Sequence, residues 1–119
     1  FDIVLDITSS NSLSENERSV YLKEISRVIK TNGYLFLRTL CKDGDKNAQN
    51  LLKNNPGKEK DTYIMPDLGL IERVFSKEDL IYTYSANFES LYLNKETHYT
   101  KFNSQSYRRN FWISGWKRK

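Results

Sequence analysis

Few side chains in this sequence could perform acid–base, nucleophilic or metal chemistry. His98 is the only histidine and Cys41 the only cysteine, so no histidine cluster or cysteine zinc site can form. Asp43 and Asp45 flank Gly44 as in a calcium loop, but the glutamate that such a loop requires near its end is missing. A lone thiol is usually a small buried residue. We therefore expect a buried Cys41, an exposed His98 in a loop, and no metal.

A polar stretch, DITSSNS over residues 6–12, follows the first apolar run. Its carboxylate, hydroxyl and amide groups could contact a ligand. They could equally serve only the turn, with Asp6 bonding the loop and Ser9 to Ser12 making turn and cap contacts. Both interpretations stay open from the residues alone.

Two apolar runs and a helix position this stretch. Phe1, Ile3, Val4 and Leu5 predict a strand over 1–7 that is buried on both faces, as in a parallel sheet, and YLFLRTL over 34–40 predicts a second one. The helix between them is long enough for a right-handed crossover. The order predicts an open α/β sheet.

The helix has clear start and stop signals. Ser14 and Glu17 form a capping box, and Asn32-Gly33 offers a left-handed stop. The spacing predicts that Val20, Tyr21, Leu22, Ile25, Val28 and Ile29 face the core. It places Arg18, Lys23, Glu24, Arg27 and Lys30 outside this stripe.

The second half of the chain predicts a helix over 77–84, capped by Ser76, and two strands, Phe88 to Leu93 and Asn110 to Trp116. We expect these strands to pair antiparallel, with residues 94–109 as a long connection. Residues 41–75 read as a loop region, either a lid or a solvated surface loop, with a short helix over 46–53.

The run FDIVLD, the Ser-rich loop, LKEISRVIK over 22–30, TNG and YLFLRTL resemble the middle of a class I S-adenosylmethionine-dependent methyltransferase. Phe1-Asp2 is similar to the start of that family's fourth strand, and Gly33 is the last glycine of its Pro-Gly-Gly turn. RVFSKEDL over 73–80 and the final Trp-Lys-Arg are similar to later elements.

The resemblance implies a partial Rossmann-like sheet: strand, helix, strand, a further helix and a C-terminal antiparallel hairpin. We expect one partial methyltransferase domain over 1–119, with a core over 1–40, a loop or lid over 41–75, and the helix and hairpin over 76–119. The family has a Gly-rich cofactor turn, yet no two glycines here lie closer than eleven positions. The half carrying that turn is therefore expected to be missing, and the fragment should bind S-adenosylmethionine weakly or not at all.

By position in the family, Asp6, Ile7 and Thr8 are expected near the cofactor. The residues expected to face the methyl acceptor are Ser9, Ser10, Asn11, Arg38 and Thr39. The loop lacks the histidine of many relatives, so no catalytic base is assigned. The implied reaction is an in-line methyl transfer, with a small molecule as the expected acceptor.

A sheet cut at its first strand would expose the edge and apolar face of residues 1–6. We expect a second copy or the missing half to cover them, so a non-catalytic dimerisation module is an alternative. A nucleic-acid module is a third, less favoured one, because the last nineteen residues hold six basic residues, no acid and several aromatics.

The composition predicts a cytoplasmic location. A single cysteine fits a reducing compartment. No apolar run approaches the roughly 20 residues of a membrane span, and no secretory leader is visible.

Overall fold

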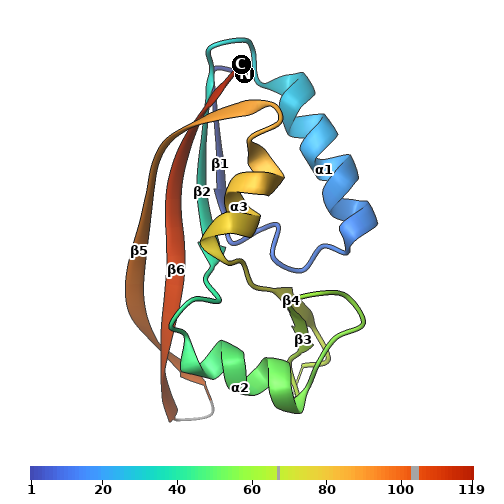
Figure 1. Cartoon of the computed structure of the whole chain (residues 1–119), viewed down its shortest axis with the longest axis vertical. Helices are drawn as coiled ribbons and strands as arrows, with labels where there is room; N and C mark the ends of the chain where they lie inside the picture. Colours follow the sequence, from blue (N-terminus) through green and yellow to red (C-terminus); the bar gives the residue numbers. More distant parts are fainter. Residues whose placement is uncertain (67, 103–104) are drawn as a thin grey trace.

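The computed structural model describes residues 1–66, 68–102 and 105–119, and it describes only the backbone of residues 100–102 and 105–107. Its elements in chain order are β1 (Ile3–Ile7), α1 (Glu15–Val28), β2 (Tyr34–Leu40), α2 (Lys46–Asn54), β3 (Thr62–Ile64), β4 (Ile71–Arg73), α3 (Lys77–Tyr84), β5 (Phe88–Phe102) and β6 (Gln105–Arg118). The four long strands form one sheet beside α1 and α3, while α2 and the β3–β4 pair lie together at one end (Figure 1).

The main sheet has the order β1-β2-β6-β5. β1 and β2 are parallel, with Ile3 opposite Tyr34 and Ile7 opposite Arg38. β6, the last strand in the sequence, lies between β2 and β5 and is antiparallel to both. The predicted strand–helix–strand unit and C-terminal antiparallel hairpin are both confirmed.

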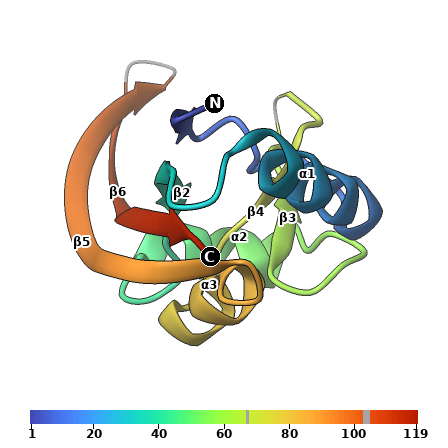
Figure 2. The same cartoon turned by 90° about the horizontal axis from the view of Figure 1, so that it is seen from above.

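One face of this sheet carries the main core. Leu35 and Leu37 of β2 lie opposite Trp116 and Ser114 of β6, and all four side chains are buried. Ile25, Ile29, Leu80 and Tyr84 of the two helices belong to the same cluster. Figure 2 shows α1 and α3 on the same side of the curved sheet. The helices therefore form one covering layer.

Part of the opposite face of the sheet, over β1 and the neighbouring ends of β2 and β5, is apolar and exposed. We call it the open face; it consists of Ile3, Leu5, Ile7, Tyr34 and Tyr92, each between 38% and 66% exposed. The prediction that the first strand is buried on both faces is wrong for this chain, because only Val4 and Asp6 point toward the helices. The expected exposure of the edge and apolar face of β1 is confirmed.

Helix α1 begins at the predicted capping box: the Ser14 hydroxyl accepts from the backbone N–H of Glu17, and the Glu17 side chain accepts from Ser14. Its predicted stripe is wrong at two positions. Arg18 is only 3% exposed and Val20 is 62% exposed. The guanidinium of Arg18 lies over the ring of Phe75, 5.1 Å from its centroid. A partner from a distant segment thus turns an arginine inward at the start of the helix.

Gly33 joins the end of α1 to β2 through a very close backbone approach. A Cβ at this position would lie 2.8 Å from the carbonyl oxygen of Asp2 and 2.9 Å from that of Lys30. The preceding Asn32 takes the left-handed conformation, with φ of 68°. The predicted stop is confirmed, with Asn32 supplying the positive φ and Gly33 the space.

The C-terminal ribbon is longer than predicted. β5 and β6 stay paired from Phe88–Arg118 to Phe102–Gln105. The prediction of a long connection over 94–109 is therefore wrong for the described residues, 94–102 and 105–109, which are paired strands. His98 lies in β5 opposite Arg109, and not in a loop, although its side chain is exposed. The sequence did not predict this part of the ribbon because its strands carry polar residues on both faces and so lack the apolar alternation that indicates a strand.

The described residues of this region, 41–66 and 68–75, are folded. α2 covers the predicted short helix, and β3 pairs with β4. Ala48, Tyr63 and Val74 are fully buried in a second cluster with Leu40 and Phe111. The segment is thus no solvated surface loop, while its role as a lid stays a prediction.

Helix α3 matches its predicted bounds, and Ser76 caps it by accepting from the N–H of Asp79. Cys41 is buried, as expected. Among the described residues, no helix is long and apolar enough to span a membrane.

Candidate functional site

A cavity of about 280 Å³ opens beside the carboxyl ends of β1 and β2. It is lined by Thr8, Asn11 and Ser12 from the loop after β1, Arg38 and Leu40 from β2, and Glu72, Arg109 and Phe111 from β4 and β6. In open α/β sheets ligands bind outside the carboxyl ends of the strands. The cavity therefore lies where the topology favours a ligand.

The loop after β1 is held in place by Asp6. Its carboxylate accepts from the backbone N–H of Ser9 at 3.0 Å and from the hydroxyl of Tyr21. Asp6 is 4% exposed, and burial, with the nearby Tyr84 and this hydrogen bond, raises the pKa of Tyr21 well above its usual range. The Tyr21 phenol thus stays neutral and donates its hydrogen bond to Asp6. Thr8 follows with φ of 59°, in the sparsely populated left-handed region.

Arg38 supplies a positive charge to the cavity. Its guanidinium lies over the ring of Phe111, 4.1 Å from the centroid, and its buried Nε has no hydrogen-bond partner among the described residues. Within the described part of the chain, no carboxylate forms an ion pair with Arg38. The aromatic face orients the group and leaves its charge free for a ligand.

Arg109 is held by a network of hydrogen bonds between buried polar side chains. Its Nη2 donates to the hydroxyl of Tyr63 at 2.7 Å, and that hydroxyl donates to Glu72 at 2.8 Å. Its Nε lies 3.4 Å from the carboxylate of Asp45. Burial raises the pKa of Tyr63 above its usual range, so this hydroxyl remains a donor. This hydrogen-bond network fixes one wall of the cavity.

The structure brings some of the predicted site residues together. Thr8, Asn11 and Arg38 line the cavity. Ser10 and Thr39, which neighbour these residues in sequence, are buried, and neither hydroxyl has a hydrogen-bond partner within the described ranges.

The other predicted residues lie around this group. Ser9 is exposed, and Ile7 is 52% exposed on the open face. The roles proposed for all these residues stay predictions.

Sequence reasoning missed five residues that line the cavity: Ser12, Leu40, Glu72, Arg109 and Phe111. The register that places Phe111 opposite Leu40 brings the start of β6 to this site, and no local signal in the sequence specifies that register. β4 arrives through the hydrogen bond from the N–H of Arg73 to the carbonyl of Asn11, 2.8 Å long.

The aromatic residues of β6 that are described serve the core. Phe111, Trp112 and Trp116 are at most 6% exposed, so their rings are not available to stack on bases. Arg109 is also buried. Phe102 and Tyr107 lie outside the residues whose side chains the structure describes. The core thus accounts for the described aromatics of this segment.

A metal site receives no support from the described residues, which contain no group of three His, Cys, Asp or Glu side chains placed to hold an ion. The cavity offers guanidinium, amide, hydroxyl and carboxylate groups for binding and orientation.

No protein-family model matches this chain. No curated protein matches it either. Solved structures do. A SAM-dependent methyltransferase from Methanosarcina mazei superposes with a TM-score of 0.80 at 20% identity, covering 99% of this chain and 59% of that one.

Two further structures have the same fold. A SAM-dependent methyltransferase from Anabaena variabilis gives a TM-score of 0.67 at 16% identity, over 97% of this chain and 48% of that one. The Burkholderia thailandensis 1,6-didemethyltoxoflavin-N1-methyltransferase, solved with its namesake compound and S-adenosylhomocysteine, gives 0.65 at 12% identity, over 100% of this chain and 44% of that one.

These likenesses show the fold. The chain has a partial Rossmann-like sheet of the class I methyltransferase type, as the sequence resemblance predicts. It spans between 44% and 59% of the length of the three structures described.

Proposed function

We propose that this chain forms the acceptor side of an S-adenosylmethionine-dependent methyltransferase that acts on a small molecule. The observation that carries the proposal is the polar cavity at the carboxyl ends of β1 and β2, in a sheet of the methyltransferase type. Its volume of about 280 Å³ is close to the lower end of small-molecule pockets.

The residues present fit one end of the cofactor. Ile7 offers an exposed apolar side chain at the end of β1, and Thr8 brings a polar backbone turn to the cavity. S-adenosylmethionine, when bound, supplies an electrophilic methyl group. The sequence contains no Gly-rich turn to hold its nucleoside part. The cofactor therefore needs residues beyond this chain.

The chain's own residues would bind and orient the acceptor. Arg38, with its charge free, attracts an acceptor that carries a negative group, and Asn11 offers an amide beside it. Leu40 and Phe111 line the same space and exclude water. Orientation is the main catalytic contribution in a displacement of this kind, because it converts an encounter into a near-attack geometry.

We propose further that the preceding half of the same domain covers β1 and the open face. β1 is an edge strand, and its Ile3, Leu5 and Ile7 side chains are all more than half exposed. Contiguous exposed apolar surface of this kind marks an interaction site. The three solved methyltransferases described extend well beyond the matched region, which argues for a covering segment of the same polypeptide over a second copy.

Titration of S-adenosylhomocysteine into this chain and into the longer polypeptide of its gene tests the proposal. We expect micromolar binding by the longer polypeptide and weak or no binding by the chain alone. Failure of the longer polypeptide to bind would overturn the proposed function.

Acceptor binding is tested separately in the longer polypeptide. Arg38→Met should lower methyl transfer to an anionic acceptor at least about tenfold, since a hydrogen bond to a charged group is lost. Binding of S-adenosylhomocysteine should change less than about twofold. Arg27→Met, at an exposed arginine of α1, is the matched control. Equal effects of both variants would remove Arg38 from the acceptor site.

Light scattering on the chain tests the covering segment. We expect the chain alone to associate through the open face, and the double substitution Ile3→Lys with Leu5→Lys to make it monomeric. The longer polypeptide should be monomeric without these changes. A longer polypeptide that still dimerises and loses its dimer on the same substitutions would favour the dimerisation module instead.

A further inference from the structure

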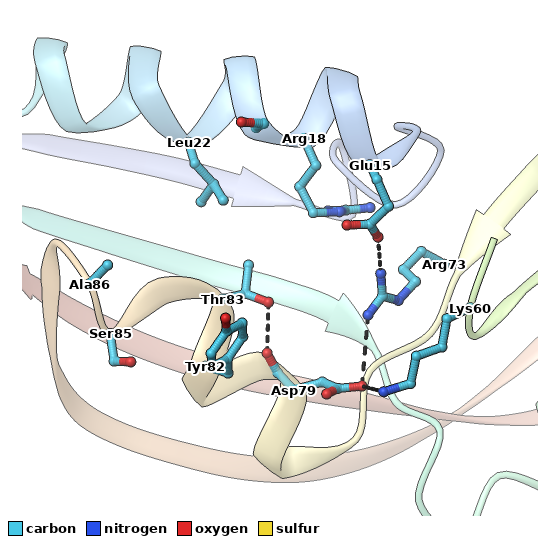
Figure 3. Close-up of a pocket in the computed structure, with 11 residues that line it drawn as sticks. Glu15, Arg18, Leu22, Lys60, Arg73, Asp79, Tyr82, Thr83, Ser85 and Ala86 are labelled. Atoms are coloured by element: carbon cyan, nitrogen blue, oxygen red, sulfur yellow. Dashed lines mark hydrogen bonds and ion pairs between the residues drawn. The ribbon is translucent and has the colours of Figure 1, made fainter.

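A second, larger cleft lies between α1 and α3. Its volume is about 680 Å³, within the range of small-molecule pockets, and it shares no lining residue with the cavity beside β1 and β2. Arg18 and Leu22 of α1 face Tyr82 and Thr83 of α3 across it, and Arg73 closes one end (Figure 3). The cleft is therefore a separate site on the helical layer.

The cations at the closed end of this cleft are mostly neutralised. Arg73 is 7% exposed and forms ion pairs with Glu15 and, at 3.7 Å, with Asp79. Lys60 lies 3.3 Å from the same Asp79 carboxylate. Figure 3 shows these four side chains converging from α1, α3 and the intervening segments. Two carboxylates thus balance two of the cations.

Among the described residues, Arg18 is the cation of this cleft without a carboxylate partner. It is only 3% exposed, and in the part of the chain that the structure describes its Nη2 donates to the carbonyl of Leu13 at 3.3 Å while Nε and Nη1 have no partner. In the described ranges no ion pair reaches Arg18, whereas Arg73, over the same Phe75 ring, has two. Burial lowers the pKa of Arg18, yet an arginine stays protonated in proteins. A buried charge of this kind is costly without a counter-charge.

The remaining lining suits the body of an organic molecule. Leu22, Ala86 and the ring of Tyr82 are apolar, and Ser19 and Ser85 add hydroxyl groups. Counting Arg18, Arg73 and Lys60 against Glu15 and Asp79 leaves one positive charge in the lining. The cleft thus favours a ligand with one negative group and an apolar part.

We propose that the cleft between α1 and α3 binds a small organic anion, a carboxylate or phosphate on an apolar body, with Arg18 as its main charged contact. The inference does not depend on the proposed methyl transfer, because it uses a different face of the sheet and different residues.

Titrations of benzoate, phenyl phosphate and neutral benzamide into the ¹⁵N-labelled full chain, followed by NMR, test the proposal. We expect both anions, or one of them, to shift the amides of residues 15–22 and 79–86, and benzamide to bind at least about tenfold more weakly. The preferred anion then identifies the group. Equal binding of benzamide, or shifts confined to other residues, would overturn the proposal.

Arg18→Met should weaken binding of the anion at least about tenfold and abolish its preference over benzamide. Arg27→Met makes the same change at an exposed arginine of the same helix and should leave both unchanged. If Arg18 only supports the loop through Leu13, the variant will lose stability but keep the preference for the anion, and the proposal fails.

Ser19→Trp tests the cleft without changing Arg18. Ser19 is exposed on α1 and lines the cleft, so an indole there should fill the space while the helix remains folded. We expect loss of anion binding with an unchanged circular dichroism spectrum. Retained binding in this folded variant would place the anion elsewhere and overturn the proposal, whatever the fate of Arg18→Met.

Discussion

The carboxylate of Asp45 accepts a hydrogen bond of 2.8 Å from the backbone N–H of Asn110, 65 positions further along the chain. The same carboxylate caps α2 by accepting from Ala48 at 2.9 Å, and it lies 3.4 Å from Nε of Arg109. One buried side chain therefore ties α2 to the part of β6 that forms a wall of the candidate site.

Replacing Asp45 by alanine should lower the free energy of unfolding by about 3 kcal/mol or more, because it leaves Arg109 buried without its charge partner. Urea denaturation measures this change. Lys46→Ala, at the exposed neighbouring position, should stay within about 0.5 kcal/mol of wild type. A loss under about 1 kcal/mol for Asp45→Ala would show that the tie contributes little.

Gly33→Ala should destabilise the chain by about 2 kcal/mol or more, because the new Cβ would meet backbone oxygens that cannot move freely. The carbonyl of Asp2 accepts from Tyr34, and that of Lys30 from Gly33 itself, each at 2.8 Å. Asn32→Gly next to it, at φ of 68°, should stay within about 1 kcal/mol. Thermal or urea unfolding of both variants measures these changes. If Gly33→Ala and Asn32→Gly were equally stable, the steric explanation for Gly33 would be wrong.

Cys41 should react slowly with thiol reagents. It is fully buried, and burial raises the pKa of its thiol to about 11, so less of it is thiolate at neutral pH. At about pH 8, we expect Cys41 to react with Ellman's reagent at least about a hundredfold more slowly in the native chain than in concentrated urea. Similar rates in the two states would contradict the buried position.

The free energy of unfolding should fall as the pH rises above about 10. Burial, chiefly, raises the pKa of Tyr84 to about 12 from an ordinary value of 10.0. Below the ordinary value both states are neutral, while between the two values only the unfolded state ionises, which favours unfolding. Urea unfolding across this range should show a loss of about 2 kcal/mol from Tyr84.

Tyr84→Phe is the control for this alkaline loss. It should remove the contribution of Tyr84, reduce that of Tyr21, whose pKa is raised by burial and by the nearby Tyr84, and leave that of Tyr63, whose pKa is raised by burial. The variant's stability should therefore decline less steeply with pH than that of the wild type. An identical decline in the two proteins would show that Tyr84 ionises as readily in the native state as in the unfolded one.

Local signals in the sequence determined the helices and their ends. The capping box at Ser14, the N-cap at Ser76 and the stop at Asn32-Gly33 act within one turn of chain, so the bounds of α1 and α3 follow closely from the residues. The apolar runs likewise determined β1, β2 and their parallel crossover. The resemblance to methyltransferases rests on these same elements, and the solved structures confirm the fold it implied.

Only the tertiary structure decided how the rest is placed. The ribbon of β5 and β6 extends through polar residues because pairing with the opposite strand satisfies their backbone groups, which no apolar pattern announces. Arg18 is buried because Phe75, far along the chain, lies under it. The loop residues Thr8 and Asn11 were predicted as site residues, but Glu72 and Arg109 join them through strand register. Local rules specify which residues form an element; long-range pairing specifies which side chains meet.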